Sequence, residues 1–171
     1  MIVLDTCVVS ELMRGPDADA RVLAWVRGLE EQPVTTVVTR AEILSGIALL
    51  PAGRRRDSLA QAAAAALSSI EMVLPITAAA ADRYAEIVAQ RARSGRPIGA
   101  MDALIAAVAS SIGASVATRD IAGFEGVGVN LVDPWQRTAG LSPLASSGPR
   151  EPRIGRTLGM TVSEAKAKGR R

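Results

Sequence analysis

Short apolar segments alternate with longer helical segments along residues 1–136, and this alternation is the strongest constraint on the fold. The segments that favour strands are 2–4, 34–37, 72–75, 115–118 and 129–132, and those with helical spacing are 8–13, 17–31, 39–50, 53–69, 77–94 and 99–112. Strands that alternate with helices usually pair in parallel and are covered by helices. The sequence therefore predicts one α/β domain with a central parallel sheet over residues 1–136.

Residues 137–171 differ from this domain in composition and charge. They are rich in Gly, Ser, Pro and Arg and contain few large apolar residues, a composition typical of disorder. They carry 8 basic and 2 acidic residues, a net charge of +6, whereas residues 1–136 carry 12 Arg and 15 Asp or Glu, a net charge of −3. We predict a basic, disordered tail that either attracts nucleic acid or is a solvated extension.

The composition excludes several kinds of active site. The chain has no His, its single Cys is Cys7, and its only Lys residues are Lys166 and Lys168. Catalysis by Ser-His-Asp or Cys-His groups, zinc sites built on His and a Walker A phosphate loop are therefore excluded. Carboxylate, hydroxyl and guanidinium groups remain, a set that suits a hard cation with oxygen ligands.

Four acids stand where a predicted strand ends or a predicted helix begins, and they are Asp5, Glu42, Asp102 and Asp120. Ligands of parallel sheets bind beyond the carboxyl ends of the strands, where Asp5 and Asp120 are placed. Buried carboxylates are costly without a cation, and residues 1–136 contain no Lys. These acids predict one acidic pocket that holds a divalent metal ion.

Each acid also has a purely structural interpretation. Thr39 and Glu42 have the spacing of a helix capping box, and Asp120 suits a turn or a helix N-cap. Asp102 in a first helical turn would interact favourably with the helix dipole. However, Asp102 has the helical spacing of an inward face that includes Ile105, Ala109 and Ile112.

Four segments together resemble one known family. They are Ile2-Val3-Leu4-Asp5-Thr6, Thr39-Arg40-Ala41-Glu42, Ile98 to Ala106 and Ala117-Thr118-Arg119-Asp120, and Asn130 to Trp135 adds a similar final strand and Pro-Trp ending. In this order and at these spacings, residues 1–136 resemble PIN-domain ribonucleases. The resemblance is strongest to VapC-type toxins of type II toxin–antitoxin systems, including their FitB-like branch.

The resemblance implies a PIN-like fold and a ribonuclease that depends on Mg²⁺ or Mn²⁺, with the four acids as catalytic residues. It makes Asp5 and Asp102 the principal metal ligands, completed by Glu42 and Asp120. It also implies RNA as substrate, an antitoxin protein as partner and a homodimer. The alternative is a PIN-like RNA-binding module without catalysis. The candidates for RNA phosphate contacts are Arg119, Arg40, Arg91, Arg93 and Arg96.

Two positions depart from the common pattern of this family. Cys7 stands where Asn or Ser is usual, and a thiol supports Asp5 through weaker hydrogen bonds. Gly123 stands where many members have Asp, which leaves Asp120 as the only acid between Thr118 and Phe124.

Phosphatases and receiver domains that also begin with a strand and an Asp use a Lys that residues 1–136 lack. Met1 leads directly into an apolar strand without a basic segment, so we expect a cytoplasmic protein.

Overall fold

The computed structural model describes residues 1–70 and 72–136. Its centre is a parallel sheet with the strand order β3-β2-β1-β4-β5. The strands are β1 (Ile2–Leu4), β2 (Val34–Thr36), β3 (Met72–Leu74), β4 (Ser115–Ala117) and β5 (Leu131–Val132). The predicted α/β class with a central parallel sheet is confirmed, while the predicted disorder of the tail falls on residues outside the described part of the chain.

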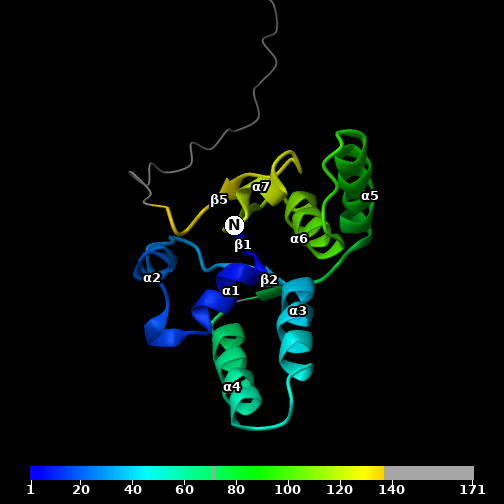
Figure 1. The fold of residues 1–171 in the computed structure, drawn as a ribbon. Helices are drawn as coiled ribbons and strands as arrows, with labels where there is room; N and C mark the ends of the chain where they lie inside the picture. The colour runs from blue at the N-terminus through cyan, green and yellow to red at the C-terminus, as the bar shows by residue number, and fades with distance from the viewer. Residues whose placement is uncertain (71, 137–171) are drawn as a thin grey trace, which may run out of the picture. The chain divides into compact units, whose positions relative to one another are not determined.

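Helices cover both faces of the sheet (Figure 1). The helices are α1 (Thr6–Leu12), α2 (Ala20–Arg27), α3 (Val37–Ala48), α4 (Arg54–Ser68), α5 (Ala78–Arg93), α6 (Ala100–Ser111) and α7 (Ile121–Phe124), with a 3-10 turn η1 (Gly15–Asp17) between α1 and α2. One face packs against α5, α6 and α7, and the other packs against α1, α2 and α4. Helix α3 contributes to both cores, through Val38 on the first face and Ile43 on the second.

The two cores follow from the alternation of side chains along each strand. Val3 and Val116 point into the core under α6, while their neighbours Leu4 and Ala117 point into the core under α1. All four are fully buried. Each fully buried Val or Leu side chain contributes about 1.5–3 kcal/mol, so the central strands are fixed on both faces.

The register of the central strands brings distant chain segments to one edge of the sheet. Leu4 of β1 lies beside Ala117 of β4, and Val3 lies beside Val34 of β2. The strand order reverses at β1, because the chain continues from β1 to β2 on one side and later returns to β4 on the other. The carboxyl edge at such a reversal is the usual ligand position of an open parallel sheet.

The structure corrects several predicted boundaries and adds two short elements. Helix α1 begins at Thr6 rather than at residue 8, because Asp5 caps it and accepts a hydrogen bond from the Thr6 amide. The predicted helix 17–31 is limited to Ala20–Arg27, and the predicted strand 129–132 is limited to Leu131–Val132. The sequence did not predict η1 or α7, which are too short for an apolar period to be recognised.

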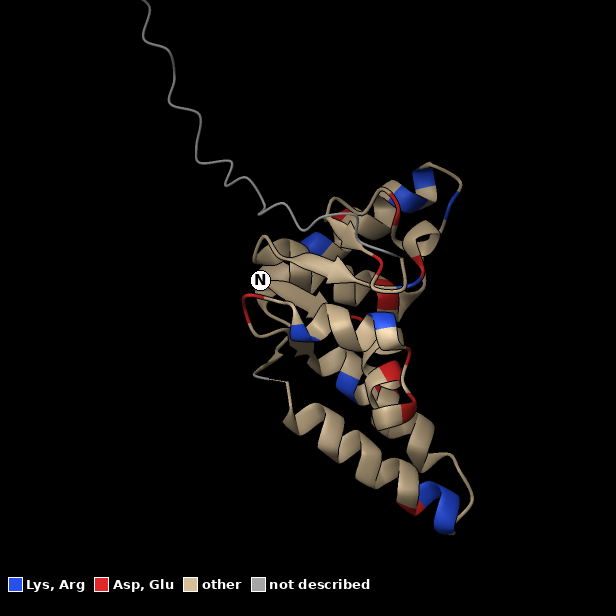
Figure 2. Ribbon diagram, turned by 90° about the vertical axis from the view of Figure 1, so that its left-hand side faces the viewer, with Lys and Arg blue, Asp and Glu red and all other residues tan. Residues whose placement is uncertain are grey.

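Helices α3 and α4 form a hairpin that projects from the sheet, and basic residues lie at the far end, where α4 begins (Figure 2). This basic run is Arg54–Arg56. None of the helices in residues 1–70 and 72–136 is both long and apolar enough to cross a membrane.

Candidate active site

Asp5 is the most buried of the four predicted acids, with 6% of its surface exposed. It follows β1 directly and is the N-cap of α1. Its Oδ1 atom accepts a hydrogen bond from the Thr6 amide at 2.7 Å, and its Oδ2 atom accepts from the Thr118 hydroxyl at 2.7 Å and the Cys7 thiol at 3.2 Å. Short hydrogen bonds to an ionised carboxylate are stronger than those between neutral groups, so these donors fix the orientation of Asp5.

Glu42 lies in the second turn of α3. This helix follows β2, which neighbours β1 on one side, whereas Thr118 follows β4, which neighbours β1 on the other side. The Glu42 Oε2 atom accepts a hydrogen bond from the Thr6 hydroxyl at 2.6 Å. The capping-box interpretation of Thr39 and Glu42 is wrong, because α3 begins one turn earlier. Thr36 is the N-cap, and its hydroxyl oxygen accepts a hydrogen bond from the Thr39 amide at 3.1 Å.

Asp102 is the third residue of α6, as predicted from its place in a first helical turn. Burial raises its pKa, and the negative charges of Asp5, Glu42 and Asp120 raise it further. Gly99 allows the carboxylate to turn toward the helix start, since a Cβ atom at this position would lie 3.0 Å from Asp102 Oδ2. Ile105 and Ala109 are fully buried below Asp102, but the predicted inward position of Ile112 is wrong, because this residue is the C-cap and is 47% exposed.

Asp120 is exposed and is the N-cap of α7. Its Oδ1 atom accepts a hydrogen bond from the Gly123 amide at 2.9 Å. A Cβ atom on residue 123 would lie 2.1 Å from Asp120 Oδ2, so any larger side chain would displace this carboxylate. The structural interpretation of Asp120 as an N-cap is therefore confirmed, and Gly123 is explained by it. The metal-binding role of Asp120 stays a prediction.

Hydroxyl groups connect three of the acids into one network. Thr118 donates to Asp5 and accepts from the Asp120 amide at 3.0 Å, and Thr6 follows Asp5 directly and donates to Glu42. Asp102 belongs to the same region, since the charges of the other three acids all raise its pKa. The structure thus gathers the four predicted residues at the carboxyl edge of β1 and β4.

This acidic site has the chemistry of a hard-cation site but not a closed cage. Its charged ligand atoms are all carboxylate oxygens, the type that Mg²⁺ and Mn²⁺ prefer. Within residues 1–70 and 72–136, no three or more Asp, Glu, Cys or His side chains are arranged so that they could enclose one metal ion. Mg²⁺ usually takes only one or two protein carboxylates and completes its shell with water and substrate phosphate, so the predicted pair Asp5 and Asp102 fits this ion.

Cys7 has more contacts in the site than the sequence suggested. In addition to its hydrogen bond with Asp5, the Cys7 Sγ atom accepts from the Arg119 amide at 3.3 Å and lies 3.6 Å from the Thr118 hydroxyl oxygen. Burial, together with the negative charge of Asp5, raises the pKa of the thiol to about 11. Cys7 therefore supports Asp5 as a neutral thiol at physiological pH.

The arginines predicted to contact RNA fall into different environments. Arg91 is 6% exposed and donates to the backbone carbonyl of Glu125, while its Nε atom has no hydrogen-bond partner among the described residues. A buried guanidinium is not available to a phosphate, so this prediction is wrong for Arg91. Its spacing from Ala80 and Ile87 on the buried face of α5 was the signal that the sequence offered. Arg96 forms an ion pair with the Glu125 carboxylate at 2.8 Å.

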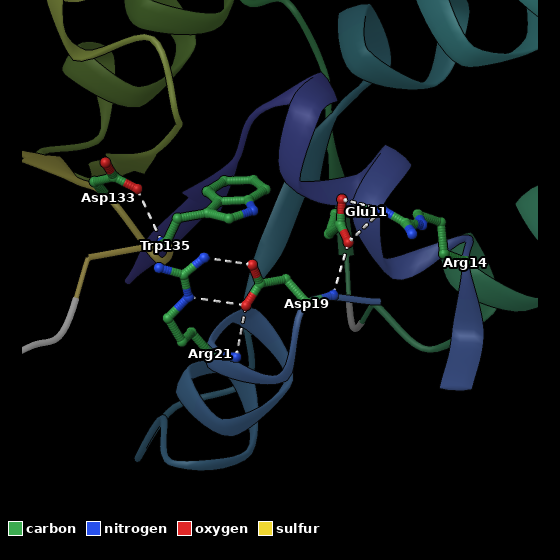
Figure 3. A network of polar contacts seen from close by, with 6 residues as sticks. All are labelled: Glu11, Arg14, Asp19, Arg21, Asp133 and Trp135. Atoms are coloured by element: carbon green, nitrogen blue, oxygen red, sulfur yellow. Dashed lines mark hydrogen bonds and ion pairs between the residues drawn. The ribbon is translucent and has the colours of Figure 1, made fainter. Parts of the chain in front are cut away.

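A polar cleft of about 240 Å³ lies beside the acidic site. It is lined by Glu11, Arg14, Asp17, Asp19, Arg119 and Trp135. Figure 3 shows Asp19 paired with Arg21 next to Trp135, and Glu11 held by Arg14 and by the Asp19 amide. Of this group, only Arg119 was predicted to contact RNA. The other residues come from α1, η1, the start of α2 and the end of the domain, and no spacing in the sequence brings them together.

Comparison with known proteins agrees with the fold. The PIN domain family matches residues 2–129. The VapC ribonuclease Y4jK of Sinorhizobium fredii is 40% identical over 141 residues, which cover 80% of this chain and 99% of that protein. Toxin FitB of Neisseria gonorrhoeae is 35% identical over 138 residues, which cover 79% of this chain and 99% of that protein.

The architecture is also shared with solved structures. The crystal structure of FitAcB from Neisseria gonorrhoeae aligns with a TM-score of 0.67 and 35% identity, over 80% of this chain and 99% of its own. The structure of FitAB bound to a DNA fragment aligns with the same TM-score and 34% identity, over 80% of this chain and 96% of its own. The acidic edge of the parallel sheet, the matched sequence and this shared architecture lead to one conclusion: the chain belongs to the PIN domain family.

Proposed function

We propose that this protein is a metal-dependent endoribonuclease that acts as the toxin of a type II toxin–antitoxin system. The observation that carries the proposal is the hydroxyl network at one edge of the sheet, in which Thr6 and Thr118 link Asp5 with Glu42 and with the Asp120 amide. Asp102 lies in the same region, where the charges of the other three acids raise its pKa. The proposal is supported by the similarity to a protein named a VapC ribonuclease and to one named toxin FitB. The reaction is hydrolysis of an RNA phosphodiester bond.

Asp5 and Asp102 would hold Mg²⁺ or Mn²⁺, with Glu42 and Asp120 completing the site directly or through water. When bound, such a cation lowers the pKa of water and stabilises the negative charge that develops on phosphate oxygens. The protein keeps the Asp5 carboxylate ready for this role, because Thr118 and Cys7 both donate to Oδ2 while the Thr6 amide donates to Oδ1. Thr6 holds Glu42 in the same way through its hydroxyl.

The repulsion among the acids supports the same conclusion. Burial and three neighbouring carboxylates disfavour the charged form of Asp102. A cation bound at this site would relieve that repulsion and favour the charged forms of all four acids. The site is therefore built at a cost in stability that cation binding recovers, a feature expected of a functional centre.

The relatives suggest the partners. The solved structures FitAcB and FitAB resemble this chain in fold and sequence, and we infer that the chain likewise binds an antitoxin that blocks its active site. We further propose that it forms a homodimer and acts on RNA in the cytoplasm. The alternative of an inactive RNA-binding module is favoured by one observation, that no three acids within residues 1–70 and 72–136 are arranged so that they could enclose one metal ion.

Cleavage of a panel of structured RNAs by the purified full chain separates these two functions. We expect cleavage with Mg²⁺ or Mn²⁺, none in excess EDTA, and loss of cleavage in Asp5→Asn. Asp82→Asn is the matched control, because it removes an exposed acid on α5, a helix that carries none of the four acids of the site. RNA binding without cleavage under any metal condition would support the inactive module, and cleavage that persists in EDTA would refute metal dependence.

Growth of bacteria that express the chain tests the toxin role separately. We expect arrest with the wild type and with Asp82→Asn, and normal growth with Asp5→Asn at equal protein level. Arrest by a well-expressed Asp5→Asn variant would show that catalysis is not its cause.

A further inference from the structure

We propose that the cleft beside Arg119 is a subsite for one base of the RNA substrate and that it favours bases with an amino group, namely adenine, cytosine and guanine, over uracil. This inference rests on the proposed function and adds a basis for sequence preference to it. The cleft is lined by Glu11, Arg14, Asp17, Asp19, Arg119 and Trp135.

The cleft is directly connected to the acidic site through the loop that follows β4. Arg119 lies between Thr118, which donates to Asp5, and Asp120. The Arg119 amide itself donates to Cys7 Sγ, which in turn donates to Asp5. A strand of RNA whose phosphate lies at the acids therefore has the cleft within reach of a neighbouring base.

Arg119 provides a planar surface on which a base can stack. Its guanidinium carbon lies 5.4 Å from the centre of the Trp135 ring, and Trp135 is buried with 8% of its surface exposed. The indole therefore supports one face of the guanidinium, while the Arg119 side chain remains exposed. Proteins that recognise single-stranded RNA stack bases on aromatic rings and on guanidinium planes. Arg119 has the support and the exposure that this role needs.

Carboxylates in fixed positions supply the hydrogen-bond acceptors for the edge of the base. Glu11 Oε1 accepts from the Asp19 amide at 2.7 Å, and Asp19 accepts from the amide, Nε and NH2 groups of Arg21 at 2.7–3.0 Å. The hydrogen bonds from Arg21 lower the pKa of Asp19 to about 2, so it stays ionised. The Asp17 carboxylate, at the exposed end of η1, shows no hydrogen bond or ion pair with any described residue.

These acceptors select between the four bases. An ionised carboxylate can only accept hydrogen bonds, and amino groups of cytosine, adenine and guanine can donate to it. Uracil presents two carbonyl oxygens and one imide N–H, so it offers fewer donors and places acceptors against the acids. The volume of the cleft is below the roughly 300–1,000 Å³ of pockets that enclose drug-sized ligands, which suits one base.

The charges in the cleft favour a base over a basic peptide segment. Arg14 and Arg119 line the cleft, and Arg21 occupies the Asp19 carboxylate. An incoming Arg or Lys side chain would meet these cations and would have to displace the pairs that Glu11 and Asp19 already form. A neutral base is not repelled by these cations, and it can donate to the Asp17 carboxylate, which shows no hydrogen bond or ion pair with any described residue.

Binding of labelled RNA in excess EDTA tests the subsite without depending on cleavage. The probes are octamers of adenosine, cytidine and uridine with a 5′ fluorescein, and anisotropy with the full chain gives their dissociation constants. We expect the adenosine and cytidine octamers to bind about 3- to 10-fold more tightly than the uridine octamer, the range of one hydrogen bond. Contacts to phosphates carry no sequence information, so electrostatic attraction of RNA by the basic residues of 137–171 would not create a base preference.

Two variants remove separate parts of the recognition. Arg119→Lys keeps the positive charge and removes the planar surface. It should weaken the binding of all three octamers, while the part of the binding that depends on attraction between charges remains. Asp17→Asn adds a donor next to the base edge, and it should reduce the preference against uridine to less than 2-fold. Arg83→Lys and Asp82→Asn on α5 are the matched controls and should behave as the wild type. Thermal melts verify that all four variants are folded.

The results distinguish this inference from the proposed function. A base preference in EDTA that Asp17→Asn diminishes, together with weaker binding of all three octamers to Arg119→Lys, supports the subsite, whether or not the protein cleaves RNA when Mg²⁺ is added. Equal affinity for the three octamers, a preference that Asp17→Asn retains, or unchanged affinities in Arg119→Lys overturns the subsite even if cleavage occurs. A hexa-arginine peptide whose affinity falls in Asp17→Asn, with RNA binding unchanged, would also overturn it and would make the cleft a peptide site.

Discussion

Replacement of Thr118 by Val tests whether the hydroxyl network holds the acidic site together. Thr118 is fully buried, and its hydroxyl donates to Asp5 Oδ2 at 2.7 Å while accepting from the Asp120 amide at 3.0 Å. Val has nearly the same shape but removes both hydrogen bonds. A hydrogen bond to a charged group contributes about 1.5–3 kcal/mol, and an amide left without its acceptor costs about 1 kcal/mol. We therefore expect Thr118→Val to lower the free energy of unfolding by about 2–4 kcal/mol.

Thr118→Ser is the matched control, because it keeps the hydroxyl and loses one methyl group, a cost of about 0.8 kcal/mol. For a chain of this length, 1 kcal/mol corresponds to about 2–4 °C in Tm. Thermal unfolding in EDTA should then show Thr118→Val about 4–16 °C below the wild type and Thr118→Ser about 2–3 °C below it. If the two variants melt within 2 °C of each other, the Thr118 hydroxyl does not hold Asp5 and the argument for a preformed site fails.

Three further predictions concern single groups of the site and of the fold. Asp102→Asn removes a carboxylate whose charged form is disfavoured by burial and by Asp5, Glu42 and Asp120. In EDTA the Tm of this variant should equal or exceed that of the wild type. Mg²⁺ at a hundredfold excess over Kd should raise the free energy of unfolding of the wild type by about 2.7 kcal/mol and that of the variant by less. The pKa of Cys7, raised to about 11 mainly by burial, predicts that iodoacetamide modifies the folded protein at pH 8 far more slowly than the unfolded chain, as followed by mass spectrometry. Thr36→Ala removes the N-cap of α3 and should lower the free energy of unfolding by about 1 kcal/mol in urea titrations, while Thr77→Ala at the N-cap of α5 gives a comparable loss away from Glu42.

The raised pKa of Asp102 also fixes the sign of the pH dependence. In the absence of metal, the folded state holds the proton of Asp102 more tightly than the unfolded state does. The stabilising contribution of this group is complete below its unfolded pKa and is lost as the pH rises through its folded pKa. Cleavage should change in the opposite direction, because the ionised form is the one that binds a cation. Activity is therefore expected to fall as the pH decreases through the folded pKa of Asp102.

The layout of the fold could be predicted because strand and helix periods are local properties of the sequence. The segments around β1 and β4 are short, apolar and followed by an acid, and their parallel pairing places Asp5 and the residues after β4 at one edge. Local competition was harder to judge. Thr36 and Thr39 both suit an N-cap, and only the end of β2 at Thr36 decides that the helix begins there.

Contacts between distant segments could not be predicted from local patterns. Arg91 belongs to the buried face of α5, but its acceptor is the carbonyl of Glu125 in a loop that no apolar period marks. The same reason applies to the cleft, where Trp135 from the end of the domain meets Arg119 and the acids around η1. These contacts depend on the packing of the whole sheet, whereas the acids of the active site each carry a local signal.

The pairing of β1 with β4 also determines when a newly made chain can assemble the acidic site. Ile2–Leu4 pairs with β2 on one side, but its second partner, Ser115–Ala117, is made late, and the four acids lie at positions 5, 42, 102 and 120. No nascent fragment that ends before Asp120 contains them all, and synthesis of 120 residues takes roughly 6–24 s at 5–20 residues per second. During that interval the acidic site is incomplete, so the parallel topology delays its assembly until the domain is almost complete.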